Sequence, residues 1–156
     1  MRILRGHSTS HTMKKIKLVL DTNIVISSLI NKNSVIRDIL LSDKILFYMP
    51  EFAVREIEKH KNIITEKSGL NEIEFFFTLN YLLRRVNVVK KDVFKKELGK
   101  AKQIMKDIDI HDSEFLALAL ALDCDGVFSN DRAFDKTDVK RWSVKEILDK
   151  LAKHTT

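Results

Sequence analysis

Four carboxylates in this chain lie where predicted core segments give way to polar sequence: Asp21, Glu56, Asp112 and Asp131. They are far apart along the chain, but they lie at the ends of elements that can meet in space. Carboxylates that gather cannot neutralise one another, so they need a cation, and oxygen ligands favour Mg²⁺ or Mn²⁺. Metals held in this way most often act on phosphate esters. The residue types and their positions therefore indicate a nuclease.

Each acid taken alone also has an ordinary structural explanation. An Asp after a strand, such as Asp21, is commonly a turn residue, and Asp112 at a helix start is commonly a cap. Glu56 alone would be a solvated charge on a helix. The joint pattern favours a site, because ionised carboxylates beside a buried helix are costly unless a cation compensates them.

The hydrophobic pattern predicts the elements that must position these acids. Short apolar runs indicate strands over residues 16–20, 45–49, 86–89, 126–129 and 139–142. Helices are expected over residues 34–41, 51–67, 71–85, 92–106 and 112–122, and from 143 onward, with capping boxes at 71–74 and 143–146. Strands that alternate with helices predict an α/β fold whose parallel sheet is covered on both sides. Ligands bind at the carboxyl ends of such strands, where Asp21 and Asp131 follow the first and fourth.

The chain has 156 residues, which is about the length of one domain. We expect the fold over residues 14–151, a disordered extension, artefactual addition or misassigned start over 1–13, and a tail over 152–156. The single cysteine, Cys124, fits a reducing compartment. The longest apolar run, Phe115 to Leu122, is far too short to span a bilayer. These features favour a cytoplasmic protein without a membrane segment.

The net charge of +6 at pH 7 is unevenly distributed. Five basic residues and no acid lie within residues 1–17, whereas residues 84–106 hold nine basic residues against two acids. Four lysines of this second segment fall within about 60° of one another on a helix: Lys91, Lys95, Lys102 and Lys106. This lysine stripe is by default a solvated helix face. The alternative is a contact surface for a polyanion such as RNA.

Four segments together resemble the PIN-domain ribonucleases in their order and spacing. They are VLDTNIVIS (19–27), MPEFAVREIEK (49–59), DIDIHDSEFLALALAL (107–122) and VFSNDRAF (127–134). The resemblance covers residues 14–151. It implies a single-domain α/β/α sandwich around a parallel sheet of four to five strands, and it implies Mg²⁺- or Mn²⁺-dependent endoribonuclease activity.

The resemblance also implies a role for each matching residue. Asp21, Glu56, Asp112 and Asp131 match the family's four acids, with Asp21, Asp112 and Asp131 as ligands of one or two metal ions. Glu56 would position the attacking water or complete the shell of a second ion. Three further residues would support the site: Ser129 as the hydroxyl residue before the fourth acid, Asp109 as an additional acid before the third, and Asn23 in the DTN motif.

The chain departs from the family pattern in ways that leave alternatives open. Many toxin members carry Thr-Arg-Asn followed by Asp-Phe at the fourth segment, whereas this chain has Ser-Asn-Asp and then Phe134, so Asp135 competes with Asp131. Glu51 and Glu58 compete in the same way with Glu56. One face of their helix cannot present all three glutamates.

The resemblance implies partners as well as chemistry. PIN-like proteins commonly form homodimers, and the toxin members bind an antitoxin protein. The predicted helix over 71–85 is apolar around most of its circumference and is the candidate interface. The sequence does not distinguish a toxin from a solitary RNA-processing enzyme.

Two other functions are weighed against a nuclease. A catalytically silent PIN-like scaffold that binds RNA or protein would have no reason to keep four repelling acids. A phosphatase or receiver-type pocket needs a second acid near Asp21 and a Lys at the end of a predicted strand, and the sequence has neither.

Overall fold

A five-stranded parallel sheet forms the centre of the computed structural model, which describes residues 14–32 and 34–155. The strands are β1 (Ile16–Leu20), β2 (Ile45–Pro50), β3 (Val86–Val89), β4 (Gly126–Phe128) and β5 (Arg141–Trp142). Their order is β3-β2-β1-β4-β5, and every neighbouring pair is parallel. The predicted α/β fold with a parallel sheet of four to five strands is therefore confirmed. The segment 1–13, expected to be an extension, lies outside the described residues.

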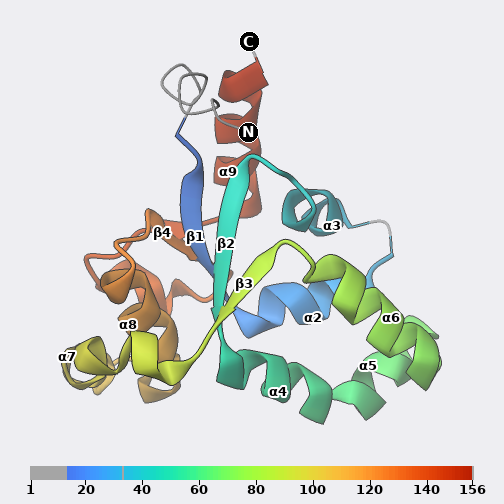
Figure 1. Cartoon of the computed structure of the whole chain (residues 1–156), viewed down its shortest axis with the longest axis horizontal. Helices are drawn as coiled ribbons and strands as arrows, with labels where there is room; N and C mark the ends of the chain where they lie inside the picture. Colours follow the sequence, from blue (N-terminus) through green and yellow to red (C-terminus); the bar gives the residue numbers. More distant parts are fainter. Residues whose placement is uncertain (1–13, 33, 156) are drawn as a thin grey trace, which may run out of the picture.

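Helices flank the sheet on both sides (Figure 1). On one side lie α7 (Lys95–Met105) and α8 (Ser113–Ala121). On the other lie α2 (Thr22–Ile30), α3 (Val35–Leu40), α4 (Glu51–Lys59), α5 (Lys61–Ser68) and α6 (Glu72–Leu82). Short 3-10 helices form at η1 (Lys91–Val93), η2 (Ile110–Asp112) and η3 (Arg132–Lys136). The last helix, α9 (Val144–Thr155), includes most of the segment expected to be a tail.

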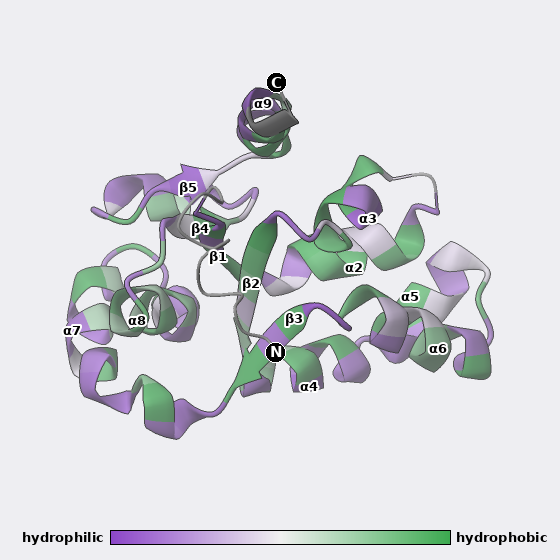
Figure 2. Cartoon of the chain, turned by 45° about the horizontal axis from the view of Figure 1, so that its top comes forward, coloured by the Kyte–Doolittle hydropathy of each residue, from purple (hydrophilic) through white to green (hydrophobic). Residues whose placement is uncertain are grey.

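The core lies between the sheet and the inner helices. Leu18, Val19 and Leu20 of β1 are fully buried, as expected for a central strand covered on both faces. Phe47 of β2 and Phe128 of β4 stack with ring centroids 6.3 Å apart. Figure 2 shows β2 as hydrophobic along its length, between helices of mixed hydropathy. Among the described residues, no helix is both long and apolar enough to cross a membrane.

Local sequence explains several element boundaries. Both predicted capping boxes form: Glu74 N–H donates to Asn71 Oδ1 at 2.8 Å, and Glu146 N–H donates to Ser143 Oγ at 3.2 Å. The helix expected over 51–67 is divided at His60 into α4 and α5. The helix expected over 71–85 ends at Leu82, before a turn that leads into β3.

The helix α2 was not predicted. Five of its nine residues are β-branched, a composition that disfavours a helix and favours a strand. Burial of Ile24, Val25 and Leu29 against the core outweighs that weak preference. The consequence for the site is direct, because Asp21 becomes the residue between the end of β1 and the first turn of α2.

Replacing Gly126 should destabilise the fold, because β5 lies against its backbone. A Cβ at Gly126 would collide with the carbonyl oxygen of Lys140 and lie 2.6 Å from Cδ1 of Trp142. We expect Gly126→Ala to lower the free energy of unfolding by about 1–3 kcal/mol, measured by urea denaturation. Gly99→Ala is the matched control, since nothing lies within 4 Å of its added methyl group in α7. That control should stabilise by up to ~1 kcal/mol, and equal effects of the two changes would contradict the prediction.

Candidate active site

Asp21 and Ser129 lie side by side because β1 and β4 are paired. Leu20 is in register with Phe128, and Asp21 N–H donates to the Phe128 carbonyl at 3.2 Å. The next residue of each chain segment therefore faces the same edge of the sheet. There, Ser129 Oγ donates to Asp21 Oδ2 at 2.6 Å, with Ser129 fully buried and Asp21 only 5% exposed.

Ser129 also holds the turn that carries Asp131. Asp131 N–H donates to Ser129 Oγ at 2.9 Å, so one hydroxyl is bonded to both segments. Asp131 in turn caps η3, because its Oδ1 accepts from Ala133 N–H at 2.9 Å.

Asp112 ends η2 and immediately precedes α8. It is 8% exposed, and its Oδ2 is buried without a hydrogen-bond partner among the described residues. Asp109, which caps η2 by accepting from His111 N–H at 3.1 Å, lies close by. Carboxylate oxygens of Asp109, Asp112 and Asp131 all lie within 4.8 Å of one another. We call these three residues the acidic cluster.

The electrostatics of the acidic cluster follow from burial and repulsion. Burial raises the pKa of Asp112 to about 8, and the charges of Asp109, Asp21 and Asp131 add to the effect. Burial also raises the pKa of Asp21, and the hydrogen bond from Ser129 opposes that rise. Without a cation, Asp112 therefore holds a proton at neutral pH. A divalent cation would stabilise the ionised form and occupy the side of the unpartnered oxygen, so the donor set fits such an ion.

A cavity of about 350 Å³ opens beside these acids. Its lining is Asp21, Thr22, Asn23, Ile26, Phe52, Glu56, His60, His111, Asp112 and Phe115. Four residues named from the sequence thus border one cavity: Asp21, Asn23, Glu56 and Asp112. Asp131 and Asp109 join Asp112 through the acidic cluster.

The structure separates the competing acids. Glu56 borders the cavity, whereas Glu51 is paired with Arg55 at 3.2 Å and neither Glu51 nor Glu58 belongs to the lining. Asp135 is bound to the guanidinium of Arg141 at 2.9 Å, whereas Asp131 lies in the acidic cluster. Glu56 itself pairs with Lys59 at 3.2 Å and is not a member of that cluster among the described residues.

Sequence reasoning missed an aromatic wall and a histidine in this cavity. Phe52 and Phe115 pack with ring centroids 5.3 Å apart. His60 Nδ1 lies 2.7 Å from the carbonyl oxygen of Glu56. A carbonyl oxygen only accepts, so Nδ1 of His60 is the donor in this contact. The prediction of one unbroken helix over 51–67 hid this position, because it treated residue 60 as a helix interior.

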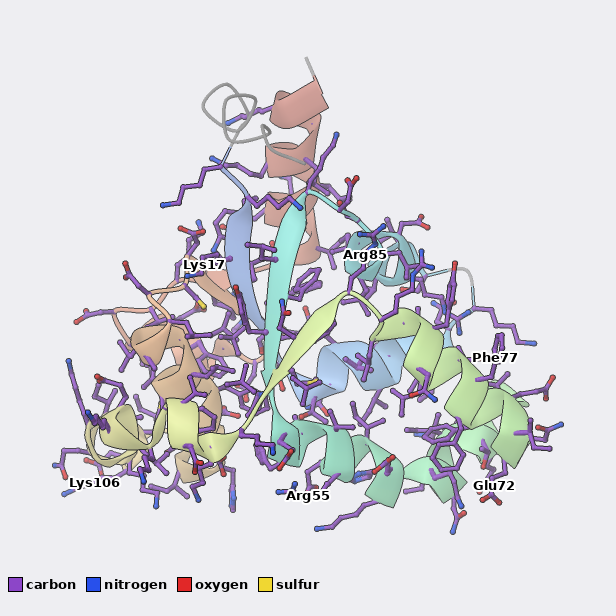
Figure 3. The ribbon with its side chains drawn as sticks, viewed as in Figure 1. Lys17, Arg55, Glu72, Phe77, Arg85 and Lys106 are labelled. Atoms are coloured by element: carbon purple, nitrogen blue, oxygen red, sulfur yellow. The ribbon has the colours of Figure 1, made fainter. Side chains whose placement is uncertain are left out.

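The lysine stripe lies beside the site but not in the cavity lining. Lys91, Lys95, Lys102 and Lys106 are all exposed. The single helix expected over 92–106 is divided: Lys91 lies in η1, Lys95 and Lys102 lie in α7, and Lys106 follows the last residue of α7. The helix α7 packs against α8 and against η2, which ends at Asp112. Figure 3 shows Lys106 at the outer limit of this side of the molecule.

The fold places acidic side chains at the carboxyl ends of β1 and β4, which is where open parallel sheets bind their ligands. The chain belongs to the PIN-domain family: the family model described as "PIN domain" matches residues 19–152, which is most of the chain. PIN domains are generally nucleases that act on RNA, which supports a hydrolase role for this protein at that general level. No curated protein matches the chain significantly.

The metal-free protein should lose stability as the pH rises. The ordinary pKa of an aspartate is 3.8, whereas the pKa of Asp112 in the folded protein is about 8. In the pH window between these two values, the folded state holds a proton that the unfolded state has released. Stability therefore falls as the pH rises through the window. We expect the melting temperature in EDTA to fall between about pH 5 and about pH 8, and Asp112→Asn to have a shallower profile. Superimposable profiles of the two proteins would contradict this assignment.

Proposed function

We propose that the protein is a Mg²⁺- or Mn²⁺-dependent endoribonuclease that hydrolyses RNA phosphodiester bonds at the cavity beside the acidic cluster. The observation that carries the proposal is the buried, unpartnered Oδ2 of Asp112, in a residue whose carboxylate belongs to a cluster with oxygens of Asp109 and Asp131 within 4.8 Å. A folded protein rarely leaves such an oxygen without a partner unless a ligand supplies one. Membership of the PIN-domain family agrees with this chemistry.

Asp21, Asp112 and Asp131 are the residues that would hold the ion, with Asp109 completing the negative charge around it. A bound divalent cation supplies Lewis-acid stabilisation of the phosphoryl charge and an acidified water. Ser129 fixes the Asp21 carboxylate by donating to Oδ2. Asp112 and Asp131 belong to the acidic cluster, whereas Asp21 does not; it is connected to Asp131 through the Ser129 hydroxyl and borders the same cavity as Asp112.

Glu56 has a different role in the proposal. It borders the cavity from α4, opposite the elements that carry the acidic cluster, and its side chain is 41% exposed. That position suits a carboxylate that orients the attacking water or completes the surroundings of a second ion. Asn23, on the same lining, offers an amide that can bind a phosphate oxygen.

The aromatic wall supports RNA as the substrate. A site for small phosphate esters needs mainly polar contacts, whereas Phe52, Phe115 and Ile26 give this cavity an apolar side. Phe115 is only 3% exposed, so the half-buried Phe52 is the ring that could stack on an unpaired base, which favours single-stranded segments.

A catalytically silent PIN-like scaffold is the alternative function. Mn²⁺ titration calorimetry separates the two, because a scaffold would give no binding heat that depends on Asp112. The toxin role and an antitoxin partner stay predictions. A neighbouring open reading frame for a small DNA-binding protein would support both.

The helix α6 is the surface through which we propose that two copies of the chain associate. Ile73, Phe77 and Tyr81 follow one another at four-residue spacing along one face, with exposed fractions of 82%, 74% and 46%. Figure 3 shows Phe77 on the outer side of α6. Large apolar side chains in a row on a surface mark an interaction site.

The order of residues on α6 favours a second copy over another partner. In an antiparallel pairing about a two-fold axis, Phe77 meets its own copy and Ile73 meets Tyr81. The apolar row is therefore symmetric about Phe77, as a two-fold pairing of identical helices requires.

The Asp21→Asn variant should stop RNA cleavage. Changes to groups that merely support metal ligands already cost about 10–100-fold, so loss of a ligand charge should cost roughly a hundredfold or more. We expect this loss in an Mn²⁺-dependent assay on a fluorescent RNA, with circular dichroism showing an intact fold. Glu51→Gln, which changes an exposed acid outside the cavity, is the control. Wild-type cleavage by Asp21→Asn would refute the assignment.

The lysine stripe should contribute to RNA affinity through phosphate contacts. We expect Lys95→Gln/Lys102→Gln to bind a single-stranded RNA more weakly, with a smaller dependence of affinity on salt concentration. Fluorescence anisotropy over a salt series measures both quantities. An unchanged salt slope would leave the stripe as a solvated helix face.

Phe77→Glu should shift the protein towards the monomer. It buries a charge at the proposed two-fold axis, where no opposite charge can meet it. Sedimentation equilibrium over a concentration series would measure the dissociation constant, which we expect to rise at least about tenfold. Val35→Glu, an equally non-conservative change at a 41%-exposed site on α3, is the control. A wild-type protein that is monomeric throughout would overturn this interface.

A further inference from the structure

We infer that Arg141 is a positioning residue of the site, which together with Asp135 fixes the loop that carries Ser129 and Asp131. The effect on metal binding rests on the proposed nuclease function. The inference goes beyond that function because it assigns a role to Arg141 and Asp135, which lie outside the cavity and the acidic cluster.

Arg141 makes three hydrogen bonds through one guanidinium group. Nε donates to Asp135 Oδ1 at 2.9 Å and Nη2 donates to Asp135 Oδ2 at 3.2 Å, a bidentate pair. Nη1 donates to the carbonyl oxygen of Ser129 at 3.2 Å. The side chain of Arg141 is only 16% exposed and its bond to Ser129 is partly buried, whereas the side chain of Asp135 is 45% exposed and its two bonds face water.

The three bonds hold both ends of one loop. Ser129 begins the loop, directly after β4, and Asp135 lies near its end in η3. Asp131 lies between these two attachment points, and its backbone N–H is bonded to the Ser129 hydroxyl. Arg141 itself is fixed by β5, whose pairing with β4 includes Ser129 N–H donating to the Trp142 carbonyl at 3.3 Å.

Ser129 is thus held through its backbone by Arg141 while its hydroxyl is bonded to Asp21. A shift of Ser129 would move the oxygen that joins Asp21 to Asp131. Arg141 would therefore act on two of the proposed metal ligands while touching neither of them through the bonds described.

Asp135 has a second effect, which is electrostatic. It places two carboxylate oxygens directly on the guanidinium, so the positive charge of Arg141 is matched locally. An unmatched cation at this position would compete with a metal ion for the field of the acidic cluster. The pair therefore supplies rigid geometry with little net charge.

The experiment compares Arg141→Lys and Asp135→Asn with wild type by two readouts on the metal-free and Mn²⁺-titrated protein. A lysine keeps the charge but cannot make a bidentate bond and a third bond together. We expect amide hydrogen exchange of Asp131 and Ala133, followed by NMR without metal, to accelerate at least about tenfold in both variants. We expect Mn²⁺ affinity by calorimetry to fall about 10–100-fold, as for groups that orient metal ligands.

Lys140→Ala is the matched control. Lys140 directly precedes Arg141, and its Nζ forms an exposed ion pair with Glu146 Oε2 at 2.7 Å. The variant removes that ion pair, so it tests whether any change beside β5 has the same effect. It should leave the Asp131 amide and the Mn²⁺ affinity unchanged. If Arg141→Lys does not fold, Asp135→Asn decides the question, because it removes the same bidentate pair and leaves the arginine in place.

The outcomes separate this inference from the proposed function. Wild-type exchange and wild-type Mn²⁺ affinity in both variants would overturn the positioning role, even with Asp21→Asn inactive. A wild-type protein that binds no Mn²⁺ would overturn the proposed function, and the exchange data would then still decide whether Arg141 holds the loop. The inference would be supported if both variants showed faster exchange and weaker Mn²⁺ binding while Lys140→Ala showed neither change.

Discussion

The parallel pairing of β1 with β4 is the constraint on which the site depends. It sets Leu20 beside Phe128, and the residues that follow, Asp21 and Ser129, must then share one buried point at the sheet edge. The two side chains meet at 2.6 Å in a place closed to water, where a hydroxyl is the smallest donor that can satisfy a carboxylate. Asp112 and Asp131 then add their carboxylates near the Asp21–Ser129 contact, whose position the pairing of β1 with β4 has already determined.

The acidic cluster shows how the molecule tolerates an unfavourable arrangement. A buried carboxyl group with a pKa of about 8 reduces stability at neutral pH relative to a solvated one. Other parts of the structure offset this loss of stability. They are the buried helix α8, the stacked aromatic rings between β2 and β4, and the capping hydrogen bonds at η2 and η3. Those features hold the carboxylates in place before any ligand arrives, which lowers the reorganisation that binding requires.

The sequence predicted the strands better than the connections between them. Buried parallel strands are nearly continuous apolar runs, so β1, β2 and β3 were located to within a residue. The helix α2 was missed because tertiary burial overrides the strand preference of its β-branched residues. The pattern of acids could be expected, but a cluster of Asp109 with Asp112 and Asp131 depends on the path of η2, which no periodicity indicates. Arg141 carried no signal at all, because its bonds to Asp135 and Ser129 exist only once β5 has paired with β4.

The packing of Phe52 on Phe115 has a consequence for the distance across the cavity. Phe52 belongs to α4, which carries Glu56, and Phe115 belongs to α8, which follows Asp112. The two rings therefore act as a spacer between the wall with the glutamate and the wall with the acidic cluster. The span between those walls is determined by side-chain volume and not by a hydrogen bond. Evolution can widen or narrow it by exchanging one aromatic residue for a smaller or larger one, without altering any charged group. Under the proposed function, the fit to a substrate and the chemistry performed on it would be encoded by separate residues.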